Sequence, residues 1–253
     1  SYGDGAQEKR FVGGSQLVSL RLAQQLGHRV ALSAPVTKIV QGNGHVDVHS
    51  ARGTVRAGHV VVACPPPLVN KINWYPHLPA KRAALISNLH MGQLMKCDAV
   101  YKSPFWRKSG LNGFGISDHG ATRAVFDNTP PQPGSPGVLL AFVGGSTWRK
   151  YGTMSLANRR AAVLKGFAEM FGDEALHPID FVEHSWPHEQ WTTGGPVAIY
   201  KPGVMTAYGS AIRTPFGRVH WAGTETSTYW TGYMDGAVRA GQRAAREILA
   251  LHK

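Results

Sequence analysis

The sequence contains few cysteines and no pattern typical of a metal site. Cys64 and Cys97 are the two cysteines among 253 residues, and neither stands in a Cys-x-x-Cys pair. This scarcity excludes a disulfide framework and favours reduced thiols in a cytoplasmic protein. The 12 histidines are scattered without a His-Glu-x-x-His motif, so we expect no metal. No apolar run is long enough to cross a bilayer and no signal peptide opens the chain, so we expect no membrane span.

Acidic residues are also scarce, with 15 Asp and Glu against 27 Lys and Arg and a formal net charge of +12. Such a balance can indicate a nucleic-acid partner. The basic residues are dispersed, however, because the pair Lys9-Arg10 follows Glu8 and Arg159-Arg160 stands nearly alone. We therefore favour a solvated basic surface over nucleic-acid binding. A third interpretation is a basic face that packs against an acidic segment of a larger protein.

The chain also lacks the glycine fingerprint of a dinucleotide-binding domain. That fingerprint, G-x-G-x-x-G between a strand and a helix, seats the pyrophosphate of a dinucleotide. Gly3-Asp-Gly, Gly42-Asn-Gly and Gly113-Phe-Gly each lack the third glycine, the preceding apolar strand or the following helix. The sequence therefore predicts no pyrophosphate site of its own.

The most informative stretch is 218–252. It predicts a short apolar strand at 218–221, a Gly-Thr-Glu-Thr turn, a polar and aromatic loop, and a helix from Gly232 to about His252. Residues three and four apart share one side of a helix, and one side here carries small residues: Ala237, Ala240, Gly241, Ala244 and Ala245. The helix N-terminus offers unpaired N–H groups to an anion or an electron-rich ring edge. The alternative is an ordinary strand-turn-helix of an α/β core without a ligand.

Three motifs of this stretch resemble the flavin monoamine oxidase family. They are Ala222-Gly-Thr-Glu-Thr, Trp230-x-Gly-Tyr-Met-Asp-Gly-Ala-Val and Ala240-Gly-x-Arg-Ala-Ala-Arg-Glu-Ile-Leu, in the order and spacing of the family. The segment Phe11-Val-Gly-Gly-Ser and the apolar strand before Pro65 extend the resemblance to roughly the C-terminal half of an amine oxidase. The resemblance implies that strand, loop and helix close over a flavin ring, with the helix N-terminus at its pyrimidine edge.

The resemblance also implies a set of functional residues. Those implied to bind the cofactor are Val36, Trp186, Gly223, Thr224, Gly232, Tyr233, Met234 and Ala237. Those implied to line the substrate pocket are Trp230, Tyr233 and Pro196. Aromatic walls guide a neutral amine and exclude water. The alternative is ordinary packing, for Val36 as a core strand residue and for the tryptophans as core side chains.

Lys96 and Tyr233 are the residues that we expect to be catalytic. Lys96 stands mid-strand in Gly92-Gln-Leu-Met-Lys-Cys, and the resemblance places here a lysine that binds a water beside flavin N5. A partly buried ammonium orders water and stabilises developing negative charge. The alternative is a lysine on a solvated strand face.

The segment Gly194-Gly195-Pro196 departs from the family pattern. Some members carry Gly-Cys-Tyr here, with the cysteine bonded to the flavin and the tyrosine paired with the position of Tyr233. We therefore expect FAD to be bound non-covalently and one aromatic wall to be missing.

The expected fold class combines α/β and α+β architecture. It is a partial FAD/NAD(P)-binding-type flavin domain with an inserted mixed-sheet substrate domain, as in amine oxidases. We expect 1–67 and 191–253 to belong to the flavin domain and 68–190 to the substrate domain. Helices are predicted at 16–26, 81–89, 155–171 and 232–252, and strands at 29–32, 35–40, 46–50, 55–57, 59–64, 91–101, 113–117, 121–127, 138–144, 181–186 and 218–221. The run 59–64 is continuously apolar, which is typical of a strand covered on both faces.

These features favour the C-terminal portion of a flavin-dependent amine oxidase, which oxidises an amine to an imine and reduces O2 to hydrogen peroxide. The expected partners are a small-molecule amine, O2 and the N-terminal half of the same enzyme, without which we expect the chain to be inactive. Two alternatives stay open: a non-catalytic fragment or split subunit that needs a separate N-terminal chain, and a related polyamine, L-amino-acid or methyl-lysine oxidase. The sequence leaves open which amine is used, whether a homo-oligomer forms, and whether this chain alone binds FAD.

Overall fold

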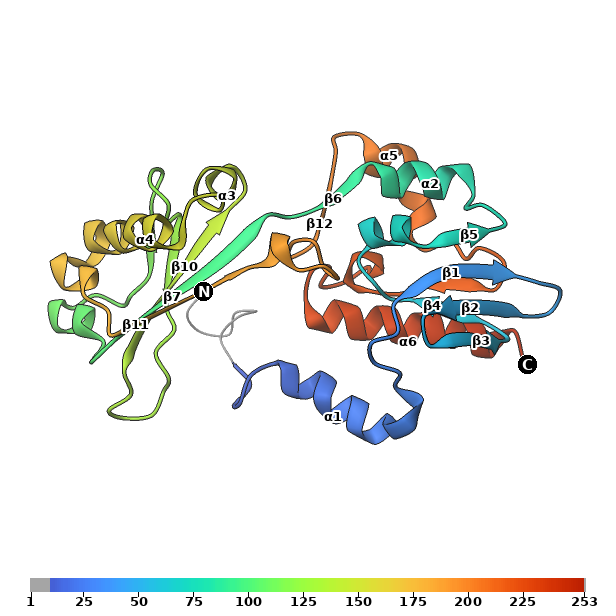
Figure 1. Ribbon diagram of the computed structural model, residues 1–253, viewed down its shortest axis with the longest axis horizontal. Helices are drawn as coiled ribbons and strands as arrows, with labels where there is room; N and C mark the ends of the chain where they lie inside the picture. Colours follow the sequence, from blue (N-terminus) through green and yellow to red (C-terminus); the bar gives the residue numbers. More distant parts are fainter. Residues whose placement is uncertain (1–9, 253) are drawn as a thin grey trace.

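The computed structural model describes residues 10–252, and its elements form two groups (Figure 1). In Figure 1 a sheet with helices on one face lies at the left, and smaller sheets beside the long C-terminal helix lie at the right. The stretch 1–9, which opens the expected flavin-domain segment, lies outside the described residues. Within the described range no helix is long and apolar enough to span a bilayer.

The left-hand group is built on a five-stranded antiparallel sheet with the strand order β11-β7-β10-β9-β8. Along β7 and β10 buried and half-buried residues alternate, because successive side chains of a strand point to opposite faces. One face of the sheet is therefore a core face, and the other, which carries Lys96, is only half covered. The strands are β7 (Leu94–Tyr101), β8 (Gly115–Ile116), β9 (Ala124–Asp127), β10 (Gly137–Gly144) and β11 (Asp180–Ser185).

Helices α3 (Ser146–Tyr151) and α4 (Leu156–Phe171) cover the core face of this sheet. The Ser155 hydroxyl accepts the Asn158 N–H at 3.3 Å and so caps the first turn of α4. Gly172, with a positive φ of 92°, ends the helix. The helix predicted at 155–171 is confirmed.

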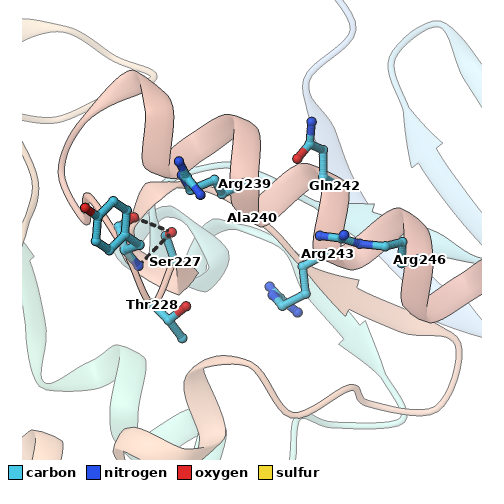
Figure 2. A pocket seen from close by; sticks show the side chains of 8 residues that line it. Ser227, Thr228, Arg239, Ala240, Gln242, Arg243 and Arg246 are labelled. Carbon is cyan, nitrogen blue, oxygen red and sulfur yellow. Dashed lines mark hydrogen bonds between the residues drawn. The ribbon is translucent and has the colours of Figure 1, made fainter.

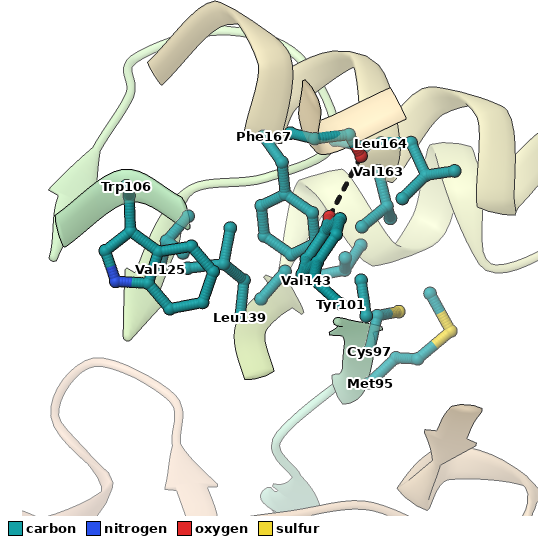
Figure 3. Close-up of a cluster of buried hydrophobic side chains, with 14 of the residues drawn as sticks. Met95, Cys97, Tyr101, Trp106, Val125, Leu139, Val143, Val163, Leu164 and Phe167 are labelled. Carbon is teal, nitrogen blue, oxygen red and sulfur yellow. Dashed lines mark hydrogen bonds between the residues drawn. The ribbon is translucent and has the colours of Figure 1, made fainter. Parts of the chain in front are cut away.

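The core between sheet and helices is large and aromatic (Figure 3). Trp106, Phe167 and Leu139 are fully buried in it. The Tyr101 hydroxyl donates to the Ala175 carbonyl at 2.9 Å, and burial raises the pKa of this phenol. Because this core lies on one face, the half-covered face is free to carry functional side chains.

The second group contains a four-stranded sheet with the order β3-β2-β1-β5. Its first three strands form an antiparallel meander, and β5 adds to β1 in parallel. Ile86 of α2 (Ala80–Ser87) shares a core with Ile39 and Val219. Thus β5 and α2 pack with the first segment although they follow residue 67, and the division of the chain at 67 and 190 stays a prediction. The strands are β1 (Val36–Gln41), β2 (Val46–Ser50), β3 (Gly53–Ala57) and β5 (Asn73–Tyr75).

The strand predicted at 59–64 is shorter and less covered than expected. β4 (Val60–Val62) pairs in parallel with β13 (Val219–Trp221) and with no other strand of the described chain. All of β13 is buried, whereas Val61 is 41% exposed. A continuous apolar strand is buried only when both of its faces are packed, so the expectation of double cover is wrong for the described residues. The strand predicted at 29–32 is not formed either, because Gly27–Arg29 make a short 3-10 helix.

The C-terminal helix α6 (Met234–Ala250) has three different sides. The buried side packs on β13 and the preceding turn through Gly236, Ala240 and Ala244. An outward apolar side carries Met234, Val238 and Leu249, together with the small residues Ala237 and Ala245. A polar side carries Arg239, Gln242, Arg243 and Arg246. The small residues predicted to share one side are therefore divided between a buried and an exposed side.

Helix α1 (Gln16–Leu26) confirms the helix predicted at 16–26 but buries none of its residues. Leu20, Leu22 and Leu26 are 53%, 54% and 48% exposed. With the outward side of α6, this helix leaves a considerable apolar surface uncovered within residues 10–252. Extended exposed apolar surface is typical of an interaction site.

A cluster of histidines attaches the end of α6 to the strand pair β4–β13. Buried His220 contacts Glu247 of α6 through Nδ1 at 3.2 Å and His59 through Nε2 at 3.3 Å. The His252 ring lies 5.4 Å from the His59 ring. Burial, followed by the nearby charges of His220, Arg218 and His252, lowers the pKa of His59 from its ordinary value. Protonating His59 therefore disfavours the attachment.

His59 is expected to lower the stability of the fold as the pH falls below about 6.5, the ordinary histidine pKa. A histidine whose folded pKa is lowered binds fewer protons in the folded than in the unfolded state, so stability rises with pH through this range. The measurement is the urea midpoint of the parent and of His59→Gln at about pH 7.5 and about pH 5.5, on either side of that pKa. The midpoint difference between the two pH values should be smaller in His59→Gln. An equal difference in both proteins would assign no role to His59.

Candidate functional site

Two connections join the two groups of elements, one near Gly92 and one near Gly195, and these connections lie side by side. There, the Gly92 N–H donates to the Val197 carbonyl at 2.9 Å, and the Gly195 N–H donates to the Gly92 carbonyl at 2.8 Å. A Cβ on Gly92 would collide with the Gly195 carbonyl, and Gly194 has a positive φ of 145°. Glycine is required at these positions because the two backbones touch.

Aromatic rings extend this contact to the half-covered sheet face. A Cβ on Gly195 would lie 3.6 Å from Trp186 Cγ, so this backbone faces the indole. The Trp186 ring contacts the His184 ring, with 4.4 Å between centroids. His184 of β11 is the cross-strand partner of Lys96 on β7. The structure thus brings into one region Pro196, Trp186 and Lys96, which are far apart in the sequence.

Lys96 is half-buried on the sheet face that lies opposite the aromatic core. Its Nζ lies 5.4 Å from the centroid of the Phe142 ring on β10. None of the ion pairs formed by the described residues includes Lys96. Asp98, two residues along the same face, accepts from the Asn128 amide at 2.9 Å, and burial raises its pKa. The Lys96 charge acts on Asp98 without forming an ion pair, so the ammonium keeps its donors available for a ligand or a water.

One hydroxyl group fixes the loop that precedes α6. Thr224 Oγ1 accepts the Gly232 N–H at 2.6 Å and donates to the Tyr233 carbonyl at 2.9 Å. Trp230 has a positive φ of 52°, and its ring lies 5.2 Å from the Tyr233 ring. Both rings are exposed, at 43% and 39%. The loop therefore presents an ordered aromatic pair, and the hydroxyl of Thr224 is used to position it.

No side chain of the described residues caps the N-terminus of α6. Gly232, just before it, has a positive φ of 91°, and a Cβ there would lie 2.9 Å from Val197 Cγ1. Asp235 in the first turn pairs with Arg239 at 2.5 Å, one turn further along the helix. The carboxylate is thus directed away from the N-terminus, whose N–H groups and partial positive charge stay open to an anion.

Glu225 lies beside the candidate site and was not predicted from the sequence as a functional residue. Its carboxylate is 8% exposed, and Oε1 accepts the N–H of Ala198 at 3.2 Å. This bond ties the turn before α6 to β12 (Ala198–Tyr200), which pairs with β6 (Leu89–Met91). An acidic residue in a turn between apolar segments was the signal that could have indicated this bond, because a buried carboxylate needs a hydrogen-bond partner.

Val36 and Ala237 lie on exposed surfaces. Val36 opens β1 and is 36% exposed, whereas Ile39 of the same strand is 2% exposed. The alternative of Val36 as a core residue is therefore not supported. Ala237 lies on the outward side of α6. Both residues are accessible to a ligand or to another segment, and their proposed contact with a cofactor stays a prediction.

The comparison with known families decides the identity of the fold. Residues 1–249 match the model of the family described as flavin containing amine oxidoreductase. The chain belongs to this family. It is 44% identical over 248 residues to AofH of Mycobacterium tuberculosis and 41% identical over 250 residues to flavin-containing amine oxidase A of Bos taurus. These matches cover 98% and 97% of this chain but 54% and 47% of the relatives, so the chain spans about half the length of the relatives it matches.

A solved structure of the amine oxidase family has the same arrangement of elements. Cyclohexylamine oxidase from Brevibacterium oxydans superimposes with a TM-score of 0.89 at 36% identity, over 95% of this chain and 53% of that chain. The predicted fold class, a partial flavin domain with a substrate domain of amine oxidase type, is confirmed. The flavin of the family suits the residues present, since the N-terminus of α6 is uncapped and Gly223 and Gly232 leave its approach free of side chains.

Proposed function

We propose that this chain is the C-terminal portion of an FAD-dependent amine oxidase that converts an amine to an imine and reduces O2 to hydrogen peroxide. The observation that carries the proposal is that an uncapped helix N-terminus, an ordered aromatic pair and a half-buried ammonium lie along one series of neighbouring residues. The series runs from Gly232 through Val197, Gly195 and Trp186 to His184, the cross-strand partner of Lys96. Membership of the flavin-containing amine oxidoreductase family supports both the cofactor and the class of substrate.

The proposed flavin site lies at the N-terminus of α6. Gly223 and Gly232 leave room for a ring close to the backbone, and the Met234 N–H is one of the unpaired first-turn donors. The partial positive charge of the helix favours the electron-rich pyrimidine edge of the ring. When bound, FAD supplies the two-electron redox chemistry. Trp186 and Ala237 are proposed to complete the walls of this site.

The remaining residues are proposed to serve the amine and the water beside the ring. Lys96 holds a water at its ammonium and stabilises negative charge that develops nearby. Trp230 and Tyr233 form an aromatic wall that receives a neutral amine and excludes bulk water. Pro196 forms the wall opposite them with less aromatic surface than a tyrosine would supply.

The experiment that tests the proposal compares this chain alone with this chain plus an N-terminal half that carries the glycine fingerprint. The chain alone is expected to retain no stoichiometric flavin, because it lacks the pyrophosphate site. The assembled protein is expected to be yellow and to release hydrogen peroxide with primary amines, polyamines or L-amino acids. Stoichiometric flavin on the chain alone would contradict the need for a second half. A flavin-loaded assembly that oxidises none of these substrates would favour a non-catalytic role.

Flavin is expected to leave the assembled enzyme intact when the protein is denatured by acid or heat. Gly195 supplies no thiol to the site, and Cys97 lies in the core on the opposite face of β7. Burial raises the pKa of Cys97 to about 12 and also raises that of Cys64, so neither forms a thiolate readily. The measurement is the mass of the denatured polypeptide, and an added mass of one flavin would show a covalent bond.

A further inference from the structure

A pocket of about 380 Å³ lies between the polar side of α6 and the loop that precedes this helix (Figure 2). It is lined by Ser227, Thr228, Tyr229, Arg239, Ala240, Gln242, Arg243 and Arg246. Three of these residues are arginines from one helix, and most of the others carry hydroxyl or amide groups. The pocket is therefore cationic and rich in hydrogen-bond donors.

Arg243 provides a positive charge that is fixed in the pocket wall. Its guanidinium donates to the Trp221 carbonyl at 2.5 Å and to Thr226 Oγ1 at 3.1 Å, and it pairs with Glu247. Its Nε is buried and has no hydrogen-bond partner within the described part of the chain. Because these bonds hold the guanidinium in one place, a ligand meets this charge already positioned.

Arg239 and Arg246 stand on either side of that fixed charge. Arg239 pairs with Asp235 through Nε, and its guanidinium lies 5.0 Å from the centroid of the Tyr229 ring, which leaves its terminal nitrogens for a ligand. Arg246 belongs to none of the ion pairs that the described residues form. Three arginines thus face two carboxylates, those of Asp235 and Glu247, and one positive charge is uncompensated.

The arginines of the pocket and the uncovered apolar residues lie on different sides of α6. Successive residues of a helix are rotated by roughly 100°, which places Arg239 and Arg246 at about 120° from the direction of Met234 and Ala245. The arginines therefore point away from the centre of the apolar side, whereas Gln242, at about 80° from Met234, lies at the border of that side.

We propose that this pocket binds a phosphate group, either as the free ion or as part of a phosphomonoester. Guanidinium groups match phosphate oxygens with paired N–H donors, and Gln242 and Thr228 add neutral donors. The volume is within the range of small-molecule sites, so it also admits an organic group carried by the phosphate. Because Tyr229 directly precedes Trp230, a bound phosphate holds the start of the loop that carries the aromatic pair.

The test is a calorimetric titration of the flavin-loaded assembly of both halves with inorganic phosphate, at an ionic strength held constant with chloride. The parent is expected to bind one phosphate per chain. Arg246→Gln and Arg239→Gln are each expected to bind it about tenfold more weakly or worse, because each loses a charge-assisted hydrogen bond. The matched control is Arg160→Gln, which removes an arginine from an apolar groove on α4 and should bind like the parent. Flavin content should be equal in all four proteins.

A parent that binds no phosphate, or an Arg246→Gln variant that binds as tightly as the parent, would overturn the proposal. An equal loss in Arg160→Gln would do so as well, because it would show general attraction to a basic surface. A second titration compares a nucleoside monophosphate with its nucleoside. Binding of the monophosphate alone identifies a phosphomonoester as a source, failure of both restricts the site to the free ion, and binding of the nucleoside contradicts the proposal. None of these measurements needs amine turnover, so their outcome is independent of the proposed oxidase activity.

Discussion

Lys96→Met is expected to slow a flavin half-reaction of the assembled enzyme by about tenfold to a thousandfold, the range for loss of one electrostatic stabiliser. The Lys96 ammonium lies 5.4 Å from the centroid of the Phe142 ring and has no ion-pair partner in the described chain. Its positive charge is therefore available to negative charge that develops beside the flavin. We expect reoxidation by O2 to slow at least as much as amine oxidation, since it passes through a superoxide-like state.

The fold should tolerate this substitution, because Lys96 points away from the core face of β7 that carries Met95 and Cys97. Stopped-flow measurement of both half-reactions provides the check, with Lys165→Met on the exposed side of α4 as the matched loss of one lysine charge. If both half-reactions of Lys96→Met run at the parent rate, Lys96 is an ordinary strand lysine. Equal slowing in Lys165→Met would show an effect of net charge instead.

Gly232→Val is expected to weaken flavin binding by about tenfold to a hundredfold, from roughly 1–3 kcal/mol of backbone strain and steric conflict. A valine at this position would have to adopt a φ of 91°, and its Cβ would lie 2.9 Å from Val197 Cγ1. The substitution also disturbs the N–H that Thr224 Oγ1 accepts, so the aromatic loop loses its anchor. We expect the flavin that remains to have a lower reduction potential, because the helix N-terminus no longer supports its anionic reduced form.

The informative comparison is with Tyr233→Ala, measured for flavin content, reduction potential and amine selectivity. The Tyr233 side chain makes no capping hydrogen bond to α6 and is 39% exposed, so its loss should spare flavin and alter selectivity. Gly44→Val controls for backbone strain alone, since Gly44 has a φ of 80° and no atom of residues 10–252 lies within 4 Å of an added Cβ. If Gly232→Val keeps its full flavin content at an unchanged reduction potential, the helix N-terminus is not part of the flavin site.

The elements that the sequence predicted are those whose signals are local. The alternation along β7 is visible in Met95, Cys97 and Ala99, and Ser155 and Gly172 mark the two ends of α4. The parallel pairing of β5 with β1 was not predicted, because a short segment with a polar first residue gives no period of its own and its partner lies over 30 residues earlier. Such a pairing depends on the packed core rather than on the local sequence.

Some residues of the candidate site were likewise predictable from the sequence, and others were not. The literal motifs selected Gly232, Tyr233 and Lys96, and the structure connects their regions through Trp186 and Val197. The two bonds of the Thr224 hydroxyl and the bond from Glu225 to Ala198 were not predictable, since each joins residues whose proximity follows from the fold. The division of α6 into three sides was also unforeseen, because a small residue is equally compatible with a buried or an exposed position.

The residues that α6 tolerates during evolution are expected to differ between its three sides. On the buried side, a Cβ on Gly236 would collide with the Trp230 carbonyl, so this position is limited by its own chain. Among the described residues, no atom lies within 4 Å of a Cβ added to Gly241, so we expect the side chains that are acceptable there to depend on the N-terminal half. We therefore expect Ala237, Gly241 and Ala245 to covary with residues of the N-terminal half across homologous enzymes, while Gly236 stays invariant without a covarying partner.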